Sequence, residues 1–323
     1  MIKKITLIIF FISITLFVTA FFTIDGSKNN AKDLTSEGLS IQKLINIYNS
    51  PYKSYTGKDT TVAIIDSGFE DSSDIQKNRI KLFKDFVNDK DDSYDDYGHG
   101  TFITGIIGAN GKYRGIAPNT NFVILKVTDN TGFVSYDNFL KALEWVNDNA
   151  EKYNINVVNM SIGFDSLDSD SINYLESLIN KIKNKNIALV AAAGNNGPTE
   201  NTILYPGAIS GVICVGYTKN NQTYRVSDDI VALSSSRGSN LLHKPDVVVS
   251  GVDILSLDTN NNYTIKSGSS FSTAIVTAVL LDILQAHPNE KISYIEDLLK
   301  NNTVRIADKY SSEEYSELFL SDK

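Results

Sequence analysis

The chain has 323 residues, of which 42% are hydrophobic and 21% are charged, which is the composition of a globular protein rather than a disordered or fibrous one. Its formal net charge of −8 argues against nucleic acid as a partner, because proteins that bind polyanions usually carry a basic surface. The single cysteine excludes an intrachain disulfide and a metal site built on several thiolates. Cys214 lies in the apolar run 211–216, so we predict an inert residue of a buried strand.

The first 24 residues combine a short basic end (residues 1–4) with an apolar run from Ile5 to Ile24. This pattern is typical of a secretory signal peptide, and Val18-Thr-Ala20 has the small residues of a cleavage site. The run is also long enough to stay uncleaved as an N-terminal membrane anchor. In both cases we expect the rest of the chain to be extracellular or at the cell surface. Residues 25–40 are polar and predict a linker or a very short pro-segment.

From residue 41 onward, strand and helix patterns alternate. Short apolar runs predict strands, and longer segments with apolar residues at helical spacing predict helices. The predicted strands are residues 60–65, 122–127, 155–162, 187–193, 211–216 and 246–249, and the predicted helices are residues 135–153, 171–186 and 269–284, with a short one within 41–55. Such an order indicates a mainly parallel sheet covered by helices on both faces. We therefore predict a single α/β domain over residues 41–305, followed by a C-terminal tail over residues 306–323.

Four polar side chains stand at strand ends and helix starts, where functional residues of parallel sheets collect. Asp66 and Asn195 each follow a predicted strand, His99 lies between two glycines, and Ser270 opens an apolar helix. A hydroxyl in the first turn of a helix lies beside free N–H groups, which suits a nucleophile whose attack creates an oxyanion. Taken alone, the same pattern also fits an ordinary cap on a packed helix. Together, however, the four groups are those that acyl transfer requires.

Three segments resemble the three signatures of the subtilisin-like serine proteases (subtilases), in the order of that family. They are Asp66-Ser-Gly68, Gly98-His-Gly-Thr101 and Gly268-Ser-Ser-Phe-Ser-Thr-Ala274. Weaker resemblances lie between them, in residues 157–163, 191–195, 234–238 and 244–248. Several motifs in the family's order are more specific than any single one, and the similarity covers about residues 41–302.

The resemblance implies a subtilisin-like three-layer fold and the chemistry of a serine endopeptidase. Ser270 would be the nucleophile, His99 the general base and acid, and Asp66 the carboxylate that orients the imidazole. Asn195 and the backbone N–H of Ser270 would hold the oxyanion. On this basis we expect a monomer that acts on a polypeptide or a peptide precursor.

The resemblance also places contacts to the substrate. Ser161, Ile162 and Gly163 would pair with an extended peptide by strand addition, although their pattern alone fits a plain buried strand. By rough register, Leu204 falls near the floor of the pocket for the residue before the scissile bond, and it would make that pocket shallow.

The chain departs from the family pattern at several positions. Phe102 stands where the family usually has a second histidine, and Ser272 and Ala274 stand where alanine and proline are usual. The loop 108–114 is shorter than the calcium-binding loop of many secreted relatives, so we expect no cofactor and no metal site there. The acidic stretch 85–96 has enough carboxylates for a loose calcium site, but a solvated acidic loop is the preferred interpretation.

Three functional hypotheses follow from these observations. Residues 25–40 are too few to bury a core, so we expect no folded pro-domain between the predicted signal and the catalytic domain. This absence favours dedicated processing of a secreted peptide precursor, such as cleavage of a lantibiotic leader. The alternatives are a general secreted protease and a catalytically silent subtilase that acts as a binding or regulatory module.

Overall fold

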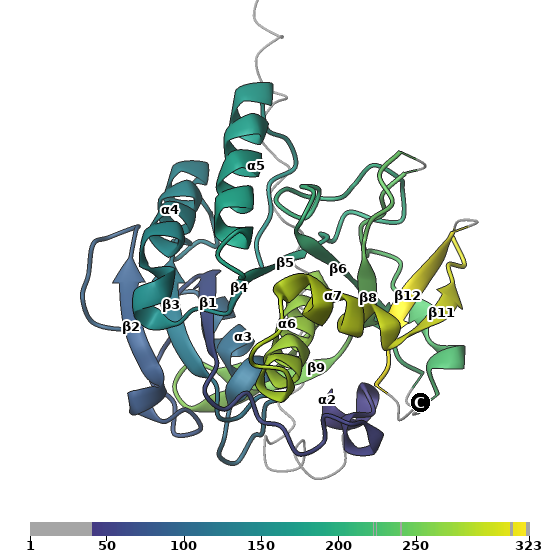
Figure 1. Cartoon of the computed structure of the whole chain (residues 1–323), viewed down its shortest axis with the longest axis horizontal. Coiled ribbons are helices and arrows are strands. Elements are labelled where there is room, and N and C mark those ends of the chain that lie inside the picture. The colour runs from purple at the N-terminus through teal and green to yellow at the C-terminus, as the bar shows by residue number, and fades with distance from the viewer. Residues whose placement is uncertain (1–40, 222, 224, 240, 311–312, 321–323) are drawn as a thin grey trace, which may run out of the picture. The chain divides into compact units, whose positions relative to one another are not determined.

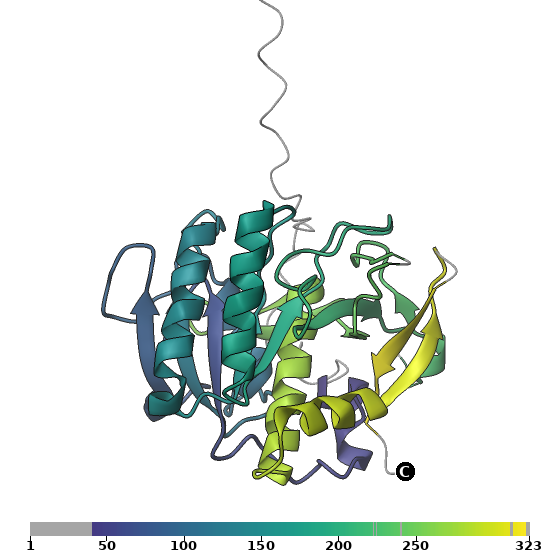
Figure 2. The ribbon, with the colours of Figure 1, turned by 45° about the horizontal axis from the view of Figure 1, so that its top comes forward.

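Residues 41–221, 223, 225–239, 241–310 and 313–320 are described by a computed structural model of the chain. Figure 1 shows their ribbon, and Figure 2 shows it turned by 45°. The segments predicted as a signal or anchor (residues 1–24) and as a linker (residues 25–40) lie outside the described residues.

A ten-stranded sheet runs through the described part in the order β11-β12-β8-β6-β5-β4-β1-β3-β2, with β7 paired to β6 (Figure 1). All pairs from β12 to β2 along this order are parallel, while β11–β12 and β6–β7 are antiparallel. The strands are β1 Thr61–Asp66, β2 Ile80–Asp85, β3 Asn121–Lys126, β4 Val157–Met160, β5 Ala188–Ala192, β6 Ile213–Lys219, β7 Ile230–Val231, β8 Val247–Ser250, β11 Thr303–Ala307 and β12 Glu314–Leu318.

Helices cover both faces of this sheet, as the two faces of β1 show. Val62 and Ile64 belong to a core cluster with α3, α6 and α7, whereas Ala63 and Ile65 belong to a second cluster with α4 and α5. Figure 2 shows α4 and α5 side by side over one face. The helices are α2 Ile41–Leu44, α3 His99–Gly108, α4 Tyr136–Tyr153, α5 Ser169–Lys183, α6 Ser269–Ala286 and α7 Ile292–Asn301, with 3₁₀ turns at Ile47–Asn49, Lys77–Arg79 and Val226–Asp228. The three-layer α/β fold predicted from the sequence is therefore confirmed.

Helix α6 is the central helix of the first core cluster. By length and composition it could span a membrane, but 83% of it is buried in the domain, as in a core helix. A small antiparallel sheet precedes it, made of β9 Ile254–Asp258 and β10 Asn262–Lys266. The turn at Gly268, with φ +153°, then starts the helix. Because the apolar residues of α6 are buried in the core, the residues in its first turn have a fixed position.

The predicted C-terminal tail is wrong. The boundary expected after residue 305 falls inside β11, and β12 joins the central sheet beside β8, where Glu317 pairs with Val248. Both hairpin strands mix polar and apolar residues, as TVRIA and EYSEL, and they lack the continuous apolar run that predicts a buried parallel strand. Cys214, in contrast, lies fully buried in β6 as predicted, and burial raises the pKa of its thiol.

Candidate active site

Asp66 and His99 form a buried pair at the carboxyl end of the sheet. Asp66 ends β1 and is 1% exposed, and His99 is the first residue of α3. The Nδ1 atom of His99 lies 2.7 Å from Oδ1 of Asp66. A carboxylate only accepts hydrogen bonds, so Nδ1 carries the proton, and Nε2 is left as the basic nitrogen. The geometry fits a general base whose tautomer is fixed by a carboxylate.

Ser270 lies in the first turn of α6, where the helix dipole and free N–H groups favour negative charge. Its hydroxyl donates a hydrogen bond to the carbonyl oxygen of Ser161, at 3.1 Å. In return, the Ser161 hydroxyl donates to the carbonyl oxygen of Ser270, at 2.9 Å. The segment Ser161–Gly163, just beyond β4, is thereby attached to the start of α6. Ser161 is buried, Ile162 is half-buried and Gly163 is exposed.

Asn195 follows β5 and is exposed. Its side-chain oxygen accepts a hydrogen bond from the backbone N–H of Ser269, at 3.0 Å. With the oxygen engaged in this way, the amide N–H₂ group is left as a donor beside Ser270. The structure thus pairs Asp66 with His99 and attaches Asn195 to the start of α6, where Phe271, the residue after Ser270, has its ring 5.6 Å from the His99 imidazole.

A model of the Subtilase family matches residues 57–317, which is most of the chain. The chain belongs to the subtilase family. It is 34% identical to the serine protease AprX of Bacillus subtilis (strain 168) over 285 residues, which cover 80% of this chain and 63% of AprX. It is 29% identical to subtilisin DY of Bacillus licheniformis over 261 residues, which cover 79% of this chain and 88% of that protein.

Solved structures agree with this assignment. Sphericase superposes with a TM-score of 0.75 at 24% identity, covering 88% of this chain and 97% of that chain, which shows a shared fold. The S41 psychrophilic protease gives the same TM-score and coverage at 25% identity. Family, relatives and fold therefore agree that the chain carries a domain of the subtilisin-like serine protease family.

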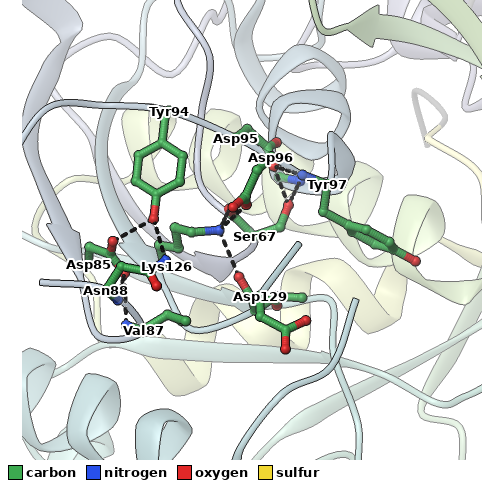
Figure 3. A network of polar contacts seen from close by, with 12 residues as sticks. Ser67, Asp85, Val87, Asn88, Tyr94, Asp95, Asp96, Tyr97, Lys126 and Asp129 are labelled. Carbon is green, nitrogen blue, oxygen red and sulfur yellow. Dashed lines mark hydrogen bonds and ion pairs between the residues drawn. The ribbon is translucent and has the colours of Figure 1, made fainter. Parts of the chain in front are cut away.

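A buried lysine that the sequence analysis missed supports the Asp66 end of this subtilase site. Lys126 lies beside Asp66 in the β1–β3 register and is fully buried. Its ammonium group donates to the carbonyl oxygens of Ser67 and Thr128, both at 2.7 Å, and to Oδ1 of Asp96 at 2.6 Å (Figure 3). All three ammonium protons therefore have an acceptor, and the main chain that follows Asp66 is held in place.

Asp95 fixes the start of α3, and hence His99. Its two carboxylate oxygens accept from the backbone N–H groups of Gly98 at 2.7 Å and Thr101 at 2.8 Å. The same carboxylate accepts from the hydroxyl of Ser67 at 2.8 Å, and this hydroxyl accepts from the N–H of Gly100. The first turn of the helix is therefore connected to the residue after Asp66.

The acidic stretch 85–96 is only partly the solvated loop that the sequence suggested. Asp85 and Asp95 are buried, at 3% and 5% exposed. Burial raises the pKa of Asp85, but hydrogen bonds from the Tyr94 hydroxyl and from the N–H groups of Asn88 and Val87 outweigh it, so the pKa lies below its ordinary value. These carboxylates accept hydrogen bonds from the chain itself (Figure 3).

Phe102, which stands where the family usually has a second histidine, packs against another phenylalanine. Phe102 is fully buried, and its ring lies 4.6 Å from that of Phe271, which in turn lies 5.6 Å from the His99 imidazole. The aromatic pair therefore supports the imidazole from the core. Ser272, a second departure, is also buried, and its hydroxyl donates to the carbonyl oxygen of Val249 at 2.9 Å. Neither substitution removes a group of the site.

Proposed function

We propose that this subtilase hydrolyses peptide bonds through an acyl-enzyme on Ser270. The Asp66–His99 pair carries the proposal, because its 2.7 Å contact is buried and leaves Nε2 as the base at the edge where α6 presents Ser270.

The proposed reaction has two halves. His99 Nε2 takes the Ser270 proton as Oγ bonds to the scissile carbonyl carbon, and the carbonyl oxygen becomes an oxyanion held by Asn195 and the N–H of Ser270. The C–N bond then breaks, and His99 gives its proton to the leaving amine. A water molecule repeats the sequence on the ester and releases Ser270. Asp66 stabilises the imidazolium in both halves. To begin, the Ser270 hydroxyl must rotate away from the Ser161 carbonyl toward His99.

The substrate is proposed to be a secreted peptide precursor, such as one that carries a lantibiotic leader. The support is the side chain of Leu204, which lies between Gly163 and Gly194 and narrows the space between the segment after β4 and the turn before Asn195. General proteolysis is the competing function, and a catalytically silent scaffold is the third. The apolar run 5–24 supports export to the cell surface or beyond, and no cofactor is required by the proposed chemistry.

A fluorophosphonate probe tests the catalytic part of the proposal. The full chain should be labelled, and the Ser270→Ala variant should not be, with circular dichroism spectra that match. Absence of labelling in folded wild-type protein would favour the silent scaffold. A peptide library then separates the substrate classes, because a processing enzyme cleaves few sequences, whereas a general protease cleaves many.

A further inference from the structure

Asn195 is exposed, and its position depends on the main chain around it. The residue before it accepts, through its carbonyl oxygen, a hydrogen bond from the N–H of Ser236 at 3.1 Å. The N–H of the residue after it, Asn196, donates to the Ser236 hydroxyl at 3.1 Å, and the N–H of Gly197 donates to the carbonyl oxygen of Ser234 at 3.0 Å. The turn that carries Asn195 is therefore attached, before and after this residue, to one neighbouring segment.

The guanidinium group of Arg237 holds that neighbouring segment, which is neither helix nor strand. Its Nη1 atom donates to the carbonyl oxygens of Ala232 at 2.9 Å and Leu233 at 3.1 Å, and also to that of Ser235. A Cβ atom added to Gly197 would lie 2.6 Å from Nη1. Real Cβ atoms do not approach other atoms so closely, so the guanidinium also lies directly against the turn of Asn195.

Asp308, the residue after β11, fixes the guanidinium itself. Nε and Nη2 of Arg237 donate to its two carboxylate oxygens at 3.0 and 3.1 Å, and neither side chain is more than 1% exposed. Two parallel hydrogen bonds to a carboxylate fix the orientation of a planar guanidinium. Replacing a buried ion pair with apolar residues is often neutral for stability, so stability alone does not account for this pair.

We propose that Arg237 and Asp308 are positioning residues for Asn195. The inference rests on the proposed function, in which the Asn195 amide donates to the oxyanion. The N–H of Ser269 orients the end of the Asn195 side chain, whereas the turn sets the place of its Cα atom. A misplacement of about 1 Å can cost about 100-fold in rate. Because both members of the ion pair are buried, they act on the reaction only through Asn195.

The test compares kcat and KM of Arg237→Lys and Arg79→Lys on one fluorogenic peptide. Arg79 is a matched control, because it is also buried and donates to three carbonyl oxygens, those of Gly108, Pro118 and Thr120. A lysine keeps the charge but loses the planar fork of donors. We expect Arg237→Lys to lower kcat about 10- to 100-fold with KM within about twofold, since the weakened interaction is made only in the transition state. Arg79→Lys should leave kcat within about twofold, and equal losses of kcat in the two variants would overturn the proposal.

Combination with Asn195→Ala shows whether Arg237 acts through Asn195. Asn195→Ala alone should lower kcat about 100- to 1000-fold. Adding Arg237→Lys should then lower kcat by less than about twofold more, because the donor to be positioned is already absent. Losses that multiply would contradict the proposal. Asp308→Asn, which keeps one acceptor oxygen for the guanidinium, should show the same dependence on Asn195 and serves where Arg237→Lys does not fold.

Hydrogen exchange separates this inference from the proposed catalysis. In the Ser270→Ala variant, the amide protons of residues 194–197 should exchange at least about fivefold faster after Arg237→Lys and at an unchanged rate after Arg79→Lys. This acceleration supports the positioning of the turn even if the wild type is not labelled by the fluorophosphonate probe. Unchanged exchange after Arg237→Lys contradicts it even in an active enzyme.

Discussion

Ser161 and Ser270 exchange hydrogen bonds in both directions, hydroxyl to carbonyl, at 2.9 and 3.1 Å. The pairing continues into the core, since Asn159 Nδ2 donates to the Ser161 hydroxyl and the Thr277 hydroxyl donates to Asn159 Oδ1, each at 2.9 Å. A chain of buried polar groups therefore connects Ser161 to a residue two helical turns beyond Ser270. Such a network fixes the positions of its side chains only when every polar group in it has a hydrogen-bond partner.

Thr277→Val removes the donor of this chain while keeping the shape of the side chain. Asn159 Oδ1 is then buried without a partner, which should lower the free energy of unfolding by about 1–3 kcal/mol. We also expect kcat/KM to fall about tenfold, since Asn159 then no longer positions Ser161. The control is Thr273→Val in the same helix, which breaks only a bond to the Ser269 carbonyl. Equal loss of activity in both variants would show that helix stability, and not the polar chain, causes the effect.

The site residues could be predicted from the sequence because each follows a pattern with a physical reason. Asp66 ends one apolar strand and Asn195 follows another, and parallel strands bring their carboxyl ends to one edge. Lys126 could not be predicted in this way, because its partners Ser67 and Asp96 are remote in sequence. A lysine at a strand end is usually exposed, so only the fold shows that it is buried. Asp95 was assigned to a solvated stretch for the same reason.

Lys126→Met keeps the length of the buried side chain but leaves the Ser67 and Thr128 carbonyl oxygens without their donor. We expect a loss of about 1–3 kcal/mol in the free energy of unfolding, because two buried carbonyl oxygens lose their donor, whereas the exposed Asp96 carboxylate can turn to water. Lys77→Met is the matched control, since the Lys77–Asp71 pair is exposed, and its removal should change stability by less than about 1 kcal/mol. Urea denaturation of both variants measures the difference. Similar values for the two would argue against a structural role for Lys126.

Removal of calcium should leave the loop after α3 intact. Asp74 organises this loop, accepting from the N–H groups of Lys112 at 3.0 Å and Tyr113 at 2.7 Å and from the Tyr263 hydroxyl at 2.8 Å. These N–H groups point to a carboxylate, whereas a calcium loop turns carbonyl oxygens inward. We therefore expect the Tm in EDTA to equal that in excess calcium within about 1 °C. A calcium site saturated at about 100 times its Kd would instead add about 2.7 kcal/mol to the free energy of unfolding and would raise the Tm. A calcium-dependent rise of several degrees would contradict the expectation.

Alkaline pH should weaken the attachment of the C-terminal hairpin through Glu317. Burial, followed by the charge of Asp229, raises the pKa of Glu317 to about 9, and burial raises the pKa of Asp229 to about 6. Within the part of the chain that the structure describes, one carboxylate oxygen of each, Oε2 of Glu317 and Oδ1 of Asp229, is buried and has no hydrogen bond to any other group. A proton shared between these oxygens would satisfy both.

The folded state therefore holds a proton at Glu317 that the unfolded state, with its ordinary pKa, has released above about pH 4.5. The free energy of unfolding should fall as the pH rises from about 5 to 9, by at most about 1.4 kcal/mol per pH unit. Glu317→Gln, which stays neutral, should flatten this dependence, whereas Glu314→Gln on the exposed side of β12 should not. Urea denaturation of the wild type and of both variants at about pH 5, 7 and 9 provides the comparison. Parallel pH profiles for Glu317→Gln and the wild type would place the proton elsewhere.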